Sequence, residues 1–101
     1  MKLSDIILQE VSFFTYTAMV QITTQETSAT DMAELVRALP GVTTVTLTSN
    51  DSARHLVVLK IKLISQKSGT QAFQALKQNA MSKYQTINVF NVADKSIEKK
   101  G

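Results

Sequence analysis

The alternation of apolar and polar positions is clearest over residues 54–65, the longest apolar-rich run of the chain. Successive side chains of a β-strand point to opposite faces, so each parity of the run defines one face. One parity is entirely apolar and the other mixes apolar residues with two lysines. The first comprises Val57, Leu59, Ile61 and Leu63, and the second Leu56, Val58, Lys60, Lys62 and Ile64. The pattern predicts a central strand of a sheet that has one covered face.

Three other segments have strand patterns: residues 13–24, 42–49 and 85–92. The first alternates cleanly and is rich in aromatic and β-branched residues, as strands are. The second is rich in threonine, which is typical of a half-exposed or edge strand. In the third, the apolar parity changes from Ile87 and Val89 to Phe90 and Val92. This change predicts a β-bulge, or a strand that leaves the sheet edge.

Two segments repeat apolar residues at helical spacing: residues 30–39 and 70–83. Thr30 or Asp31 is the expected N-cap of the first, and Ser68 or Thr70 that of the second. Pro40-Gly41 ends the first helix, because proline cannot continue it and glycine accepts the left-handed backbone that follows many helices.

Near the N-terminus, residues 3–11 place Leu3, Ile6, Ile7 and Val11 on one stripe of a helix. A helix this short is not stable alone in water, so it must dock on another surface. The last segment, 94–101, is basic and has a single apolar residue, Ile97. The sequence therefore predicts an N-terminal amphipathic helix (1–12), one folded domain (13–93) and a basic flexible tail (94–101).

The element order β-α-β-β-α-β predicts an α+β ferredoxin-like sandwich with both helices on one face of the sheet. The four antiparallel strands would have the spatial order 4-1-3-2. The inner face is expected to hold Phe14, Tyr16, Ala18, Val20, Ile22, Val45, Leu47, Val57, Leu59, Ile61, Leu63, Ile87 and Val89.

The outer face of this sheet is not polar enough for an ordinary solvated surface, and large exposed apolar patches mark interaction sites. Its interface candidates are Met19, Leu56, Val58, Lys60, Lys62 and Ile64. Either the N-terminal helix or a second copy of the chain could cover them. A short helix cannot cover four strands, which favours self-association, most simply as a homodimer.

The composition limits the chemistry. The chain of 101 residues is one domain in size, with no cysteine, a single histidine and three glycines. Disulfides, thiolate metal sites and cysteine nucleophiles are excluded, and no glycine-rich phosphate loop exists. Asp31 and Glu34 are expected to stabilise the helix N-terminus as cap and dipole partners rather than to act as an acid/base pair. His55 is expected at a hairpin end. We therefore predict no enzyme, with no catalytic, cofactor-binding or metal-binding residues and no cofactor.

The net charge of +3 is unevenly distributed: residues 1–50 carry two basic and five acidic side chains, and residues 51–101 carry nine and three. Such asymmetry suits an anionic partner, a head-to-tail contact between copies or simply a solvated surface. RNA-binding domains with this element order stack bases on outer-face aromatics, whereas Phe14 and Tyr16 are expected to face inward. Nucleic-acid binding through lysines is therefore a weaker alternative. The chain has neither a membrane-spanning run nor a signal-type apolar stretch, which predicts a cytoplasmic protein.

Leu39, Pro40, Gly41, Val42 and Val45 resemble the helix-to-strand turn of ACT and related ligand-binding regulatory domains. Together with the strand around 59–63, this run also resembles small ferredoxin-like proteins of tailed phages that have no assigned role. The resemblance implies a ferredoxin-like fold and, as alternatives, small-molecule regulation or a phage-associated location in a bacterial host. ACT domains often bind amino acids near a glycine at the first strand-to-helix turn. The corresponding turn, residues 25–29, has no glycine, so no binding residue is transferred.

The sequence thus favours a non-enzymatic interaction module that self-associates through its sheet face or an edge strand. Binding to a different protein is also compatible with the sequence. The alternatives are an ACT-like small-molecule-binding domain and a weak RNA- or DNA-binding domain.

Overall fold

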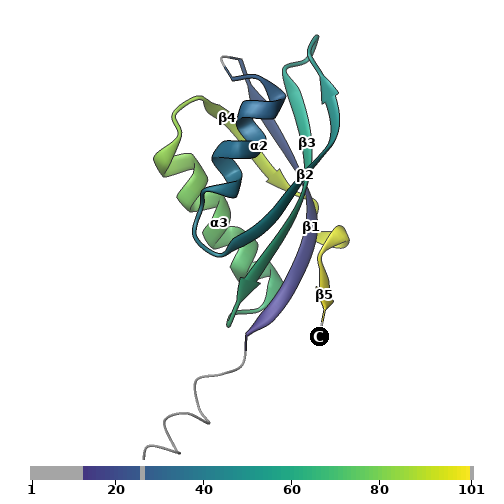
Figure 1. The fold of residues 1–101 in the computed structure, drawn as a ribbon, viewed down its shortest axis with the longest axis vertical. Helices are drawn as coiled ribbons and strands as arrows, with labels where there is room; N and C mark the ends of the chain where they lie inside the picture. Colours follow the sequence, from purple (N-terminus) through teal and green to yellow (C-terminus); the bar gives the residue numbers. More distant parts are fainter. Residues whose placement is uncertain (1–12, 26, 101) are drawn as a thin grey trace, which may run out of the picture.

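The structure, a computed structural model, describes residues 13–25 and 27–100, and the expected N-terminal helix lies outside these residues. The elements are β1 (Phe14–Thr24), α2 (Ala29–Arg37), β2 (Val42–Asp51), β3 (Leu56–Ser65), α3 (Gly69–Lys83), β4 (Ile87–Val92), the 3-10 helix η1 (Asp94–Ser96) and β5 (Glu98–Lys100). Both helices lie on the same side of an antiparallel sheet (Figure 1). This α+β arrangement is consistent with a ferredoxin-like fold.

The strands follow the order β2-β3-β1-β4, which is the order 4-1-3-2 counted from the opposite edge. The two central strands, β1 and β3, pair without interruption from Phe14–Ser65 to Thr23–Leu56. Their inner side chains form the centre of the core, and Val20 and Ile61 are 0% exposed. The strands with the clearest apolar parity in the sequence are therefore the central ones.

The two helices cover this core with apolar stripes, Met32 and Val36 on α2, and Phe73 and Leu76 on α3. Ser68 caps α3, as one of the two expected residues, by accepting a hydrogen bond from the backbone of Gln71.

The expected caps of α2, Thr30 and Asp31, are wrong. Ser28 has the extended backbone that a cap requires, and its Oγ accepts from the N–H of Asp31, while Thr30 and Asp31 are already helical.

The segment expected to be a flexible tail is instead structured up to residue 100. The backbone N–H of Ala93 donates to Met19 O at 3.0 Å, and Ser96 Oγ accepts from Met19 N–H at 2.8 Å. Beyond them, β5 pairs with Thr15–Thr17, so β4, η1 and β5 follow one edge of β1 in succession. The single apolar residue, Ile97, packs against the core. Backbone pairing along this edge of β1, together with the packing of Ile97, explains why a basic segment forms a strand.

Two residues expected on the inner face differ from that expectation. The predicted bulge is present: Thr24 pairs with Ile87, whereas Thr23 pairs with Val89. The extra residue between them turns Val89 outward, where it is 49% exposed, and turns Phe90 into the core. Leu47 pairs with the buried Leu59 but is itself 40% exposed, because β2 is an edge strand.

Candidate interaction surface

The strand register brings the six interface candidates together on the outer face, opposite the helices. Met19 pairs with Lys60, and Leu56, Val58, Lys62 and Ile64 share the parity of Lys60 along β3. Met19, Leu56 and Val58 are half-buried, both lysines are exposed, and Ile64 is 42% exposed. Apolar side chains thus remain accessible on this face within the described part of the chain.

The outer face divides into two halves of different character. The lysine half comprises Thr15, Thr17, Met19, Lys60, Lys62 and Ile64, with Glu98 of β5 beside Thr17 at its edge. The neutral half comprises Gln21, Thr23, Leu56, Val58 and Val89. Beside the neutral half, the hairpin residues Asp51 and Arg54 pair with each other at 3.6 Å. The cations of this face are therefore concentrated at the end of the sheet where β1 begins.

Val89 is the member of this surface that sequence reasoning missed. It was expected in the core on the parity of Ile87, but the bulge places it opposite Thr23 on the outer face. The change in apolar parity within 85–92 was the available signal. Locating the bulge between Ile87 and Val89, rather than after Val89, would have given the correct face.

A hollow of about 220 Å³ opens in the lysine half, where η1 interrupts the β4–β5 edge. Its lining includes Met19 and Lys60 of the central strands and Ser96 and Glu98 from the edge. The lining of the hollow therefore includes the ammonium of Lys60 on β3, the carboxylate of Glu98 on β5 and the thioether of Met19 on β1.

Both sheet edges are irregular. Register shifts in β2 leave Thr43 and Thr48 as extra residues relative to β3. Each hydroxyl donates to a β3 carbonyl, Thr43 Oγ1 to Lys62 O at 3.1 Å and Thr48 Oγ1 to Val58 O at 2.9 Å. Bulges twist an edge and hinder pairing with a further strand, and the opposite edge is interrupted by η1. Both edges thus interrupt the regular backbone pairing that an added strand would continue.

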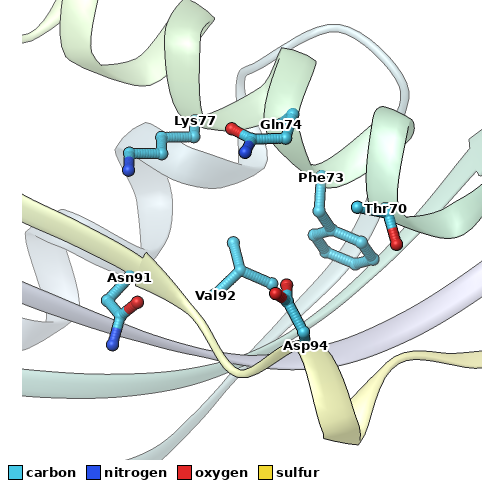
Figure 2. A pocket seen from close by; sticks show the side chains of 7 residues that line it. All are labelled: Thr70, Phe73, Gln74, Lys77, Asn91, Val92 and Asp94. Atoms are coloured by element: carbon cyan, nitrogen blue, oxygen red, sulfur yellow. The ribbon is translucent and has the colours of Figure 1, made fainter.

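Another hollow, of about 100 Å³, separates α3 from the β4–η1 edge. Figure 2 shows Phe73 and Val92 extending toward each other across it, with Asp94 beside them and Lys77 extending away along the helix. The two charged groups do not converge on one point, as an acid/base pair acting on one substrate must.

Of the other residues considered for chemistry, Asp31 and Glu34 lie one turn apart on α2, and His55 lies in the β2–β3 turn. Glu34 forms an exposed ion pair with Arg37 at 2.9 Å, and Asp31 is exposed at the start of α2. His55 is exposed in the β2–β3 turn and has a left-handed backbone, with φ of 55°. Tyr16, expected inward, is buried at 5% exposure.

The hollow beside the first strand-to-helix turn has a volume of about 320 Å³, and its lining includes Thr24, Ser28 and His55. Thr24 is 3% exposed, and its Oγ1 has no hydrogen-bond partner.

Comparisons with protein-family models, with curated proteins and with solved structures found no match. Within residues 13–25 and 27–100, no group of three or more His, Asp or Glu side chains is arranged to hold a metal ion. No helix of the described segments is long and apolar enough to cross a membrane.

Proposed function

We propose that this protein is a self-associating interaction module that forms a reversible homodimer through the neutral half of its outer sheet face. The observation that carries the proposal is the group of apolar side chains on either side of Gln21 and Thr23 on the outer face: Leu56 and Val58, which are half-buried, and Val89, which is 49% exposed. Exposed apolar patches of this kind are typical of protein contacts. The irregular edges also support association through the sheet face rather than through an edge strand.

A second copy fits this surface because the neutral half is compatible with itself. In a two-fold dimer, the same patch meets its own copy. The neutral half brings no like charges together, whereas the lysine half would place Lys60 and Lys62 against their equivalents, and like-charge contacts at interfaces are costly. We therefore place the dimer axis near Val58.

The available area indicates a weak dimer. Strands about 4.8 Å apart that rise about 3.3 Å per residue give a four-stranded face of roughly 600 Å². Stable complexes bury about 800 Å² per partner, and the neutral half offers only part of this face. We expect a concentration-dependent equilibrium rather than a permanent dimer.

Sedimentation velocity over a concentration series tests this proposal. We expect the wild-type sedimentation coefficient to rise with concentration. Val58→Glu should weaken association at least about tenfold, because it places two carboxylates at the axis. Gln78→Glu, an exposed residue of α3 on the opposite side, is the matched control and should associate as the wild type does. Thermal unfolding of both variants verifies that they are folded.

Two results contradict the proposal: a wild-type protein that stays monomeric at the highest soluble concentration, or a folded Val58→Glu variant that associates as tightly as the wild type.

The second candidate function is small-molecule binding of the ACT type. The buried Thr24 hydroxyl without a partner, beside the hollow at the first strand-to-helix turn, favours it. Buried polar groups normally have a partner, and a polar ligand would supply one. A thermal-shift screen of amino acids and nucleotides tests this function. Stabilisation that Thr24→Val removes supports it, and no shift with any compound counts against it.

A further inference from the structure

The edge of β1 is interrupted between β4 and β5, and this interruption forms the hollow in the lysine half. β4 pairs with β1 only from Val20 onward, and β5 pairs with it only up to Thr17. Between them η1 takes the place of a strand (Figure 1), and it binds both backbone groups of Met19 through Ala93 and Ser96. The backbone arrangement therefore fixes the position of the hollow.

A buried hydroxyl lines this hollow without a partner. Thr17 is 8% exposed, and its Oγ1 has no hydrogen bond to any residue in the described part of the chain. Buried polar groups are normally hydrogen-bonded, so a bound molecule with a polar group would complete this one. The Ser96 hydroxyl is already used, because it donates to Ala93 O at 2.6 Å and accepts from Met19 N–H. The hollow therefore offers one free hydroxyl beside the Met19 thioether.

Opposite charges stand on the two sides of the hollow. Lys60 pairs with Met19 on one side of β1, and Glu98 pairs with Thr17 on the other. Both charged side chains are exposed, and within residues 13–25 and 27–100 neither forms an ion pair. Lys62 shares this face but is not part of the lining. A ligand that contacts both sides must carry one anionic and one cationic group.

The strand register gives the spacing of the two charges. Strands about 4.8 Å apart place β3 and β5 roughly 10 Å apart across β1, and the two residues from Thr17 to Met19 add about 7 Å along it. The Cα atoms of Lys60 and Glu98 are therefore roughly 12 Å apart. Side chains stand nearly perpendicular to a sheet and each charged contact takes up about 3 Å, which leaves roughly 6 Å between the charges of the ligand.

We infer that this hollow binds a small linear zwitterion of the length of a dipeptide. Two extended residues span about 7 Å, so the terminal groups of a dipeptide match this spacing, whereas those of a single α-amino acid lie too close together. The carboxylate contacts Lys60 and the ammonium contacts Glu98. The central amide lies over β1, within reach of the Thr17 hydroxyl. The volume of about 220 Å³ is below the roughly 300–1,000 Å³ of drug-sized pockets, as a ligand this small requires.

This site goes beyond the proposed dimer and does not depend on it. The dimer axis lies near Val58 in the neutral half, whereas the hollow lies in the lysine half. Binding is therefore measured at a protein concentration where sedimentation shows a monomer, and either property can fail without the other.

NMR titration of the isotope-labelled full chain with glycylglycine, at low and constant ionic strength, tests the site. We expect saturable shifts of the Thr17, Met19 and Ser96 amides. The dissociation constant should be about 1–10 mM, because two surface ion pairs and one hydrogen bond give weak binding. N-acetylglycine lacks only the ammonium group, and glycylglycine amide lacks the carboxylate. Each should bind at least threefold more weakly, by about the loss of one surface ion pair.

Removing one charge at a time tests the orientation of the ligand. Lys60→Gln should weaken glycylglycine about three- to fivefold and leave glycylglycine amide unchanged, because Lys60 contacts only the carboxylate. Glu98→Gln should weaken glycylglycine to a similar extent and leave N-acetylglycine unchanged. Lys62→Gln removes the same charge from the same face outside the lining, so this matched control should bind as the wild type does.

A ligand without an amide tests the role of the Thr17 hydroxyl. Thr17→Val should weaken glycylglycine about threefold or more, because it removes one hydrogen bond. The same variant should leave binding of 5-aminopentanoate unchanged, since this zwitterion has a similar charge spacing but no amide. Thr15→Val, on the same face but outside the lining, is the matched control. Thermal unfolding verifies that each variant is folded.

Amide shifts that rise linearly with glycylglycine and never saturate overturn the inference, as does a folded Lys60→Gln variant that binds glycylglycine as tightly as the wild type. Equal affinities for N-acetylglycine and glycylglycine also overturn it, because the hollow then binds an anion rather than a zwitterion.

Discussion

At the scale of single residues, close contacts determine which side chain a position can hold where the hydrophobic pattern does not. Gly69, the first residue of α3, sits where a Cβ would lie 2.7 Å from Cγ2 of Ile97 and 3.2 Å from the ring of Tyr16. The missing side chain therefore leaves room for Ile97 against the core. Tyr16 is held there by donating its hydroxyl to Lys67 O at 2.8 Å, so the ring cannot easily move aside.

We expect Gly69→Ala to destabilise the protein by about 1–2 kcal/mol through overpacking, despite the better helix propensity of alanine. Urea denaturation measures the change. In an Ile97→Ala background, which removes the contacting methyl group, the same substitution should cost clearly less, with the closer approach to the Tyr16 ring as the remaining cost. Equal costs in both backgrounds would show that the contact is not the cause.

At the scale of elements, the sequence predicted the strands and helices whose apolar pattern is internally consistent, including the parity change in β4. What it missed depended on contacts between distant segments. The start of α2 depends on the backbone conformation of Ser28, and the face of Val89 on the exact position of a bulge. The β5 strand depends on hydrogen bonds from residues 93–100 to β1, which a lysine-rich segment does not reveal.

The β5 strand should depend on Ile97 as its anchor. We expect Ile97→Asp to release residues 97–100, so that their amides exchange at unprotected rates while the β1–β3 pairing remains protected. Lys95→Asp, an exposed residue of η1, introduces the same acid without removing an apolar contact and should keep β5 protected. Hydrogen exchange measured by mass spectrometry resolves the two segments. Continued protection of β5 in Ile97→Asp would mean that backbone pairing alone holds it.

At the scale of the whole molecule, the fold mixes the two halves of the sequence. The acidic residues 1–50 supply β1, α2 and most of β2, and the basic residues 51–101 supply β3, α3, β4 and β5. In the order β2-β3-β1-β4, strands from the two halves alternate. The charge asymmetry is not carried by the strands of the first half, because β1 and residues 42–50 of β2 have no charged side chain. In the described part of residues 1–50, the acidic side chains are Asp31 and Glu34, and both lie on α2.

The lack of charge in the neutral half sets an expected salt dependence for the proposed dimer. A contact through the uncharged neutral half should change its dissociation constant less than about threefold between roughly 50 and 500 mM sodium chloride, because screening acts on charges rather than on apolar burial. Sedimentation at several salt concentrations measures this. A steep weakening with salt would point to a contact between oppositely charged surfaces and would move the interface away from Val58. An unchanged or slightly tighter dimer fits burial of Leu56, Val58 and Val89.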